Sequence, residues 1–189
     1  FLDPGSVNLG GTGVDGLPPA MDFVYTNTFN EIRYAMDLAD QLGLGPSIAI
    51  FEPGFLQVVL AYHEAEALPA GTLVKFYFAA GGYLTKGRAL WGAPPIHEAL
   101  DLYLAMLGDA PIPWAVAVVG GSLCDSVIFD DALLRGGHVR VGIEDDQDGP
   151  TNLEQVKAVA ERIAGGGRVV ASPSEARAIL RLPTPLTPH

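Results

Sequence analysis

The segment 136–146, Gly-Gly-His-Val-Arg-Val-Gly-Ile-Glu-Asp-Asp, holds the densest group of side chains that could do chemistry. Side chains alternate along a β-strand, so a strand over 139–144 places Arg140 and Glu144 on one face and apolar side chains on the other. We expect the apolar face to meet helices, which turns Arg140 and Glu144 toward the interior. Buried charges need partners. The two side chains therefore form either a mutual ion pair or part of a ligand site.

From residue 22 onward the sequence predicts repeated β-α units that could position these side chains. Short runs rich in Val, Ile, Phe or Tyr alternate with helical patterns, which is typical of a parallel sheet covered by helices. The first helix should follow Thr28, which forms a Thr-x-x-Glu capping box with Glu31. The expected strands are 23–26, 48–51, 73–78, 114–119 and 139–144, and the further helices are 55–67, 95–107, 122–134, 153–164 and 174–180. Strand order should follow sequence order, because crossovers between parallel strands are right-handed.

Two long glycine-rich loops, 5–19 and 79–94, lie where β-α loops belong in this pattern. Loops of this length in a compact domain are usually functional. In a parallel array they should share the carboxyl-terminal end of the sheet with Glu144, and we expect a pocket there. Residues 11–16 match a dinucleotide-binding Gly-x-Gly-x-x-Gly pattern, but Pro18 and Pro19 stand where its helix would have to open, so we reject that interpretation.

Composition narrows the class of protein. The chain has 189 residues, 49% of them hydrophobic, and a mean hydropathy of +0.27, so it can bury a substantial core. Eleven Lys and Arg stand against 22 Asp and Glu, a net charge of −11 that argues against nucleic acid and membrane surfaces as partners. No apolar run reaches the roughly 18 residues of a membrane span. The single cysteine, Cys124, excludes an internal disulfide, favours a cytoplasmic location, and is interpreted as a buried structural thiol.

Several stretches, in order along the chain, resemble one enzyme family. The segment 136–145 is similar to the Gly-Gly-His-Val-Arg-Val-Gly-Leu-Glu-Asp signature of the β-keto acid cleavage enzymes. Residues 152–154 resemble that family's Asn-x-Glu-Leu helix start, and 170–180 its closing Ala-Thr-Pro-x-Glu-Ala-Arg-x-Ile-Leu. Residues 113–120 resemble its seventh strand, and 2–10 the end of its third.

The resemblance implies roles for individual residues. Members of the family bind one zinc ion through two histidines of the second strand and one glutamate of the eighth, which Glu144 matches. Asp145 matches the proposed general base, and Arg140 matches the residue that steadies the reacting carboxylate or enolate. Asn27 or Thr28 matches a polar pair that touches substrate. Gly5 and Ser6, at the end of the third strand, are expected to bind substrate as well. Thr28 is equally well explained as a helix cap.

The chain also departs from the family's pattern. Phe1 stands where members carry a serine, and the fifth-strand motif Glu-x-Phe-Asp-x-Gly-His reads Ala49-Ile-Phe-Glu-Pro-Gly-Phe55. None of the four histidines lies in a His-x-His pair, so the zinc histidines are expected upstream. A (β/α)8 barrel needs roughly 250 residues. We therefore expect this chain, which starts at Phe1 rather than Met, to lack about 60 residues or more of the barrel.

The resemblance thus implies an α/β fold of the (β/α)8 TIM-barrel type, present from the end of strand 3 through strand 8 and the closing helices. The partial catalytic domain covers 1–182, and 183–189 form a proline-rich tail that should be mobile. The implied reaction converts a β-keto acid and acetyl-CoA into acetoacetate and a new acyl-CoA, in an enzyme that tends to form homo-oligomers. The alternatives are another metal-dependent barrel lyase or aldolase, and a ligand-binding barrel without catalytic activity.

Overall fold

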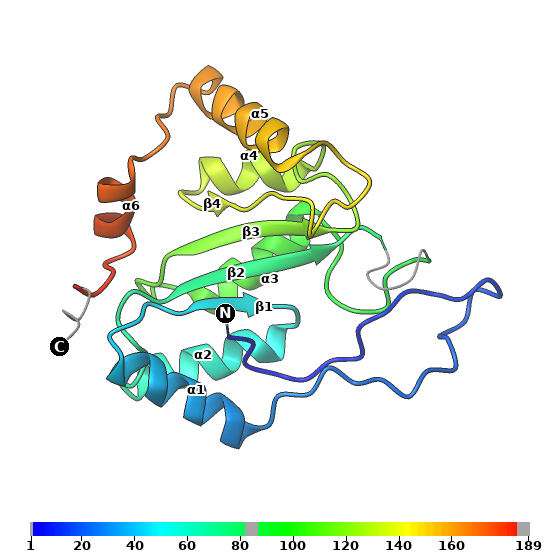
Figure 1. Ribbon diagram of the computed structural model, residues 1–189, viewed down its shortest axis with the longest axis horizontal. Coiled ribbons are helices and arrows are strands. Elements are labelled where there is room, and N and C mark those ends of the chain that lie inside the picture. Colours follow the sequence, from blue (N-terminus) through cyan, green and yellow to red (C-terminus); the bar gives the residue numbers. More distant parts are fainter. Residues whose placement is uncertain (1, 82–86, 185–189) are drawn as a thin grey trace.

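The structure is a computed structural model that describes residues 2–81 and 87–184 (Figure 1). Within these residues a four-stranded parallel sheet has its strands in sequence order, which confirms the predicted parallel α/β fold. The strands are β1 (Ser47–Ile50), β2 (Leu73–Ala79), β3 (Trp114–Val119) and β4 (His138–Val139). The helices are α1 (Phe29–Gln41), α2 (Pro53–Glu64), α3 (His97–Leu107), α4 (Val127–Leu134), α5 (Asn152–Gly165) and α6 (Pro173–Ile179).

The sheet is buried on both faces, as its nearly continuous apolar strands require. Along β2, Phe76 and Phe78 belong to the larger core, which the sheet forms with α2, α3 and α4. Phe76 stacks on Tyr103 of α3, with ring centroids 4.9 Å apart and an interplanar angle of 8°. Full burial of such a side chain contributes about 1.5–3 kcal/mol. Tyr77 points to the opposite face, where it belongs to a smaller core with Trp91.

The predicted first strand, 23–26, is wrong. Tyr25 pairs antiparallel with Val7, and the two residues exchange backbone hydrogen bonds of 2.9 Å each. The position beside β1 is occupied instead by Leu2, which bridges to Ile48 in parallel. Since one edge of a strand can pair with only one neighbour, segment 23–26 remains outside the sheet.

The predicted last strand, 139–144, is much shorter in the structure. β4 ends at Val139, and the last ladder contact is the Arg140 amide, which donates to the Val116 carbonyl at 2.9 Å. The amides of Asp145 and Asp146 then both donate to the Gly142 carbonyl at 3.1 Å, which closes a turn. The period-two alternation expected for Arg140 and Glu144 therefore does not apply.

Three helices begin with a capping box, and the box of Thr28 with Glu31 is the one predicted from the sequence. Reciprocal capping boxes are present at Thr28 with Glu31, Thr151 with Glu154, and Ser172 with Glu175. α4 begins at Val127 instead of residue 122, because the Ser126 side chain accepts from the Ile128 amide and caps the helix there.

Three further expectations concern the surface and the ends of the chain. In the part of the chain that the structure describes, no helix is long and apolar enough to cross a membrane. Cys124 is only partly buried, and burial raises the pKa of its thiol. Most of the predicted tail, 185–189, lies outside the described residues.

Candidate functional site

A cavity of about 270 Å³ lies at the carboxyl-terminal end of the sheet. Both long loops contribute to its wall, through Leu9 and Trp91, and Glu144 lies beside them. Its lining residues are Asp3, Leu9, Phe23, Tyr25, Phe51, Tyr77, Trp91, Val119, Glu144 and Asp145. Figure 1 shows the loops beyond the ends of β2 and β3. The two long loops, Glu144 and the cavity therefore lie at the same, carboxyl-terminal end of the sheet, as predicted.

The two loops are joined to each other by backbone hydrogen bonds. Gly11 and Ala89 form an antiparallel bridge, the Thr12 amide donates to the Arg88 carbonyl at 2.8 Å, and the Leu90 amide donates to the Gly10 carbonyl at 3.0 Å. A Cβ atom at Gly87 would lie 2.0 Å from the Thr12 carbonyl oxygen, so only glycine fits this crossing. The cavity wall on this side is a single paired structure.

Arg140 organises the charged end of the cavity. Its guanidinium donates to the carboxylates of both Asp145 and Glu144. It also lies over the Tyr77 ring, with the guanidinium carbon 5.5 Å from the ring centroid, which is cation–π geometry. A planar guanidinium can bind two acceptors at once. Arg140 therefore fixes two carboxylates relative to an aromatic wall.

Asp145 is the buried member of this pair. The residue is 6% exposed, and its carbonyl accepts from the Gly120 amide at 2.8 Å, which ties the turn after β4 to the end of β3. Burial raises the pKa of the carboxyl, whereas the Arg140 guanidinium opposes that rise. A carboxylate with a raised pKa is a stronger proton acceptor than an exposed one.

Glu144 does not point into the interior, contrary to the prediction. Its side chain is 63% exposed and lies at the mouth of the cavity. The turn centred on residues 142–145 is the physical reason, because it turns Asp145 rather than Glu144 toward the sheet. The ion pair with Arg140, one of the two interpretations left open, is present. A ligand role for Glu144 remains a prediction.

Sequence reasoning missed two buried charges near the cavity, Asp3 and Lys75. Asp3 is 7% exposed, accepts a hydrogen bond from the Tyr25 hydroxyl, and has a pKa raised by burial. Burial and the neighbouring Asp3 carboxylate also raise the pKa of Tyr25. For Lys75, the sequence signal that could have revealed it is its position as the one charged residue in the apolar run Leu-Val-Lys-Phe-Tyr-Phe. For Asp3 the signal was the short Leu-Asp-Pro-Gly segment.

The four residues predicted to bind substrate lie together, but in a second hollow of about 430 Å³. The Ser6 hydroxyl donates to the Asn27 carbonyl at 3.1 Å, and the Asn27 side-chain amide donates to the Gly5 carbonyl at 2.9 Å. Thr28 caps α1, as its alternative interpretation predicted. The hollow borders Pro4, which follows Asp3 of the main cavity. A substrate role for Gly5, Ser6, Asn27 and Thr28 remains a prediction.

The residues described, 2–81 and 87–184, contain no group of three or more His, Cys, Asp or Glu that could hold a metal ion. His63 lies on α2, His97 binds Asp131 at 2.8 Å, and His138 begins β4. Glu144 offers a carboxylate at the cavity mouth, a ligand type that zinc accepts. A metal site that included Glu144 would therefore need further ligands from outside these residues.

Comparison with known proteins places these features in a family. A model of the beta-keto acid cleavage enzymes matches residues 1–182. The chain belongs to the β-keto acid cleavage enzyme family. The chain is 28% identical to a 3-keto-5-aminohexanoate cleavage enzyme of Fusobacterium nucleatum subsp. nucleatum, over 96% of the chain and 60% of the relative. It is 27% identical to a 3-dehydrocarnitine:acetyl-CoA trimethylamine transferase of Rhizobium meliloti (strain 1021), over 85% of the chain and 51% of the relative.

Solved structures show the same fold. The chain superposes on a structure described as a ternary complex of ObcA with C4-CoA adduct and oxalate, with a TM-score of 0.64 and 17% identity. The match covers 96% of this chain and 44% of the other. A binary complex of ObcA with oxaloacetate gives a TM-score of 0.63 at 17% identity, over 97% of this chain and 45% of the other. The chain thus spans about half the length of the proteins it matches.

Proposed function

We propose that this protein cleaves a β-keto acid in a reaction with acetyl-CoA, giving acetoacetate and a new acyl-CoA. The observation that carries the proposal is Arg140, which holds Asp145 and Glu144 together at one end of an aromatic-lined cavity. Family membership supports the class of reaction, and the names of two relatives, which act on keto acids or use acetyl-CoA, support the substrates.

Asp145 is the residue that we propose as the general base. Transfer of the acetyl group of acetyl-CoA to the keto acid requires removal of a proton from the carbon between its ketone and its carboxylate, and a buried carboxylate with a raised pKa suits that step. The negative charge then develops on the carbonyl oxygen. Arg140, which contacts two carboxylates of the cavity lining, would stabilise that charge. The two residues are in contact, so proton removal and charge stabilisation occur at one point. The CoA thiolate released then takes up the acyl group as acetoacetate leaves.

We further propose a zinc site that includes Glu144. When bound, zinc would act as a Lewis acid that polarises the keto group of the substrate. Glu144 would supply one oxygen ligand, and two histidines would come from the part of the family's barrel that this chain does not span. The present residues would orient the glutamate through its contact with Arg140.

The remaining parts of the proposal concern the whole protein. We infer that the four-stranded sheet is the carboxyl-terminal portion of a (β/α)8 barrel, a reading that the similarity in fold to ObcA supports. Gly5, Ser6, Asn27 and Thr28 would bind the more distant part of the substrate. We also expect a cytoplasmic homo-oligomer, with small molecules as its ligands.

The test uses three variants of the full-length protein, with metal analysis by mass spectrometry and a CoA-thioester assay on each. Glu144→Gln should lose most bound zinc and activity, because a neutral amide is a much poorer ligand than a carboxylate. Asp145→Asn should keep zinc and lose roughly two to four orders of magnitude in turnover, the range for a lost general base. Arg140→Ala should keep zinc, lose activity and lose some stability, since it leaves carboxylates without their cation.

Two matched variants control for the loss of an acidic charge. Glu161→Gln on α5 and Asp148→Asn both alter exposed carboxylates that do not line the cavity. Both should retain zinc and turnover. Full zinc occupancy in Glu144→Gln would exclude the ligand assignment, and undiminished turnover in Asp145→Asn would exclude the base assignment.

A further inference from the structure

Lys75 is a buried lysine on the cavity side of the sheet. It lies in the middle of β2 and is 4% exposed. Its neighbours Val74 and Phe76 belong to the core under the helices, so alternation places Lys75 on the same face as Tyr77. The residues paired with it in register are Ala49 and Ala115, whose small side chains leave room for the lysine stem.

Packing alone does not account for a lysine at this position. Transfer of an ammonium group into the interior carries a penalty of several kcal/mol, and buried charges can often be replaced by apolar side chains without loss of stability. β2 is otherwise built of Leu, Val, Phe, Tyr and Ala. A lysine at the centre of β2 therefore suggests a role in the neighbouring site, which begins two residues further along the strand at Tyr77.

The Tyr77 ring connects Lys75 to that site. The Lys75 ammonium lies 5.5 Å from the ring centroid, and the Arg140 guanidinium carbon lies at the same distance of 5.5 Å. Two cations that share one ring repel each other. Lys75 is two residues closer to the amino-terminal end of the sheet than Tyr77. Its repulsion therefore opposes any movement of the guanidinium deeper along the ring, away from Asp145 and Glu144.

We propose that Lys75 is a positioning residue, whose ammonium beside the Tyr77 ring keeps the Arg140 guanidinium in contact with Asp145. The role in catalysis rests on the proposed function, whereas the coupling of Lys75 to Arg140 does not. The charge of Lys75 is also sensitive to pH. Burial, and then the nearby Arg140, lower the pKa of Lys75 to about 8. Among the charged side chains of residues 2–81 and 87–184, Asp3, Asp145 and Glu144 favour its charged form.

The activity test compares Lys75→Met and Lys75→Arg with Lys157→Met, a control at an exposed lysine of α5. The full-length wild type should lose kcat as pH rises through about 8, the pKa of Lys75. Lys75→Arg keeps its charge and should remain active above that pH. Lys75→Met should lose about 10–100-fold in kcat at every pH, with a smaller change in KM, as for other residues that orient a catalytic group. Lys157→Met should behave as wild type.

A structural readout separates this inference from the proposed function. The Nε–H resonance of Arg140, assigned by its loss in Arg140→Lys, should shift in the wild type with a midpoint near the Lys75 pKa of about 8. It should not shift with pH in Lys75→Arg. This measurement needs no substrate, so it tests the coupling of Lys75 to Arg140 even if the wild type shows no CoA-thioester turnover. It also requires only the Lys75→Arg variant, so it can be made even if Lys75→Met does not fold. An Arg140 resonance that titrates identically in wild type and Lys75→Arg would overturn the proposal, as would a Lys75→Met enzyme with wild-type kcat.

Discussion

At the scale of single residues, the site depends on the shape of one side chain. Arg140 contacts two carboxylates and an aromatic face at the same time. A guanidinium offers donors in a planar fork, whereas a lysine ammonium is a compact point charge. The identity of this cation, and not only its charge, therefore matters.

Arg140→Lys should consequently reduce activity while leaving the fold intact. A lysine retains the charge but cannot hold both Asp145 and Glu144 in the same arrangement. Loss of one hydrogen bond to a charged group corresponds to about 1.5–3 kcal/mol, or about ten- to a hundredfold in kcat/KM. The control is Arg162→Lys on α5, where the guanidinium also contacts one carboxylate, Asp130, through two nitrogens. Equal kcat/KM values for Arg140→Lys and wild type would show that the forked donor geometry of the guanidinium is not required.

The sequence identified the segment that holds these residues but not their orientation. Arg140 and Asp145 meet at the carboxyl-terminal end of the sheet, whereas strand alternation had placed Arg140 on the same face as Glu144 and not Asp145. The inward orientation of Glu144 was wrong, because alternation holds only while a strand continues and the turn at Gly142 ends it. Asp3 and Lys75 went unnoticed because burial depends on neighbours distant in sequence, which periodicity cannot reveal.

At the scale of elements, helix caps are the best test of whether Thr28 is structural or functional. Thr28 and Thr151 form the same capping box, but only Thr28 borders the hollow with Ser6 and Asn27. Thr28→Ala and Thr151→Ala should each reduce the free energy of unfolding by about 1 kcal/mol. If Thr28 also contacts substrate, only Thr28→Ala should raise KM. Chemical denaturation and steady-state kinetics measure the two effects, and equal KM values in both variants would leave Thr28 as a cap alone.

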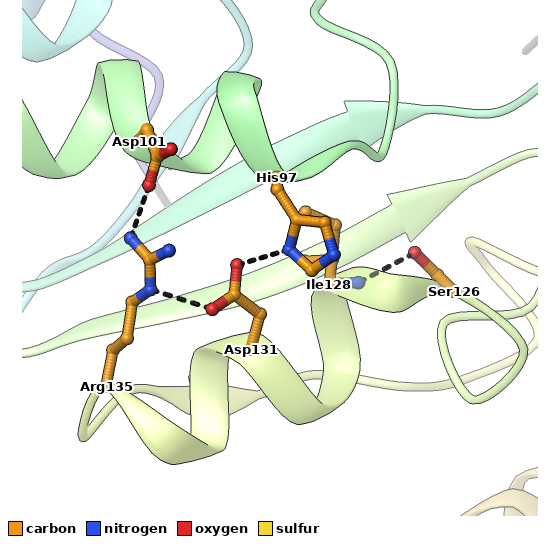
Figure 2. Close-up of polar contacts among 6 residues, drawn as sticks. All are labelled: His97, Asp101, Ser126, Ile128, Asp131 and Arg135. Carbon is orange, nitrogen blue, oxygen red and sulfur yellow. Dashed lines mark hydrogen bonds and ion pairs between the residues drawn. The ribbon is translucent and has the colours of Figure 1, made fainter.

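A network of ionic contacts joins α3 to α4 (Figure 2). The Asp131 carboxylate accepts from Arg135 Nε at 2.7 Å and lies 2.8 Å from His97 Nδ1, and Arg135 also contacts Asp101 on α3. Burial alone would raise the pKa of Asp131, but its contacts with His97 and Arg135 lower it below the ordinary value of 3.8. The charged carboxylate is therefore the form that links the two helices.

Asp131→Asn should weaken this link in a pH-dependent way. A carboxyl whose pKa is lowered by folding stabilises the native state fully above its unfolded pKa, and this contribution is lost as pH falls through the folded pKa. The variant should be about 1–3 kcal/mol less stable near neutral pH. The difference should begin to decrease as pH falls below the ordinary pKa of 3.8, and it should vanish only below the lower pKa of the folded state. Urea unfolding at several pH values measures it, with the exposed Asp148→Asn as control. A difference that does not depend on pH would indicate a packing effect.

Strands that have a strong local sequence pattern could be predicted. Strand positions for which two segments compete could not. β1, β2 and β3 lie within about one residue of the predicted spans, because each is a short apolar run bounded by turns. Segment 23–26 has an equally good strand composition, yet it pairs with Val7 while Leu2 occupies the edge of β1. Which of two segments takes one edge is a property of the whole fold, and local propensity does not determine it.

At the scale of the whole molecule, charge is the dominant feature. The net charge is −11, and like charges are closer together in the folded chain than in the unfolded one. Salt screens this repulsion, since the Debye length falls from about 30 Å at 0.01 M to about 8 Å at 0.15 M ionic strength. The melting temperature should therefore rise over this range by about 2–4 °C, equivalent to about 1 kcal/mol. Calorimetry in NaCl and in choline chloride should give the same rise, and a fall would show that attractive ion pairs outweigh the repulsion.

The bridge between the two long loops has a consequence for protein engineering. A residue inserted in or deleted from one loop would move Gly11 or Ala89 out of register with its partner, so a change of length on one side requires a matching change on the other. Variants in which the length of only one loop is changed would mostly lose the pairing that forms this side of the cavity wall. Changes of length should therefore be made in the two loops together, so that Gly11 still pairs with Ala89.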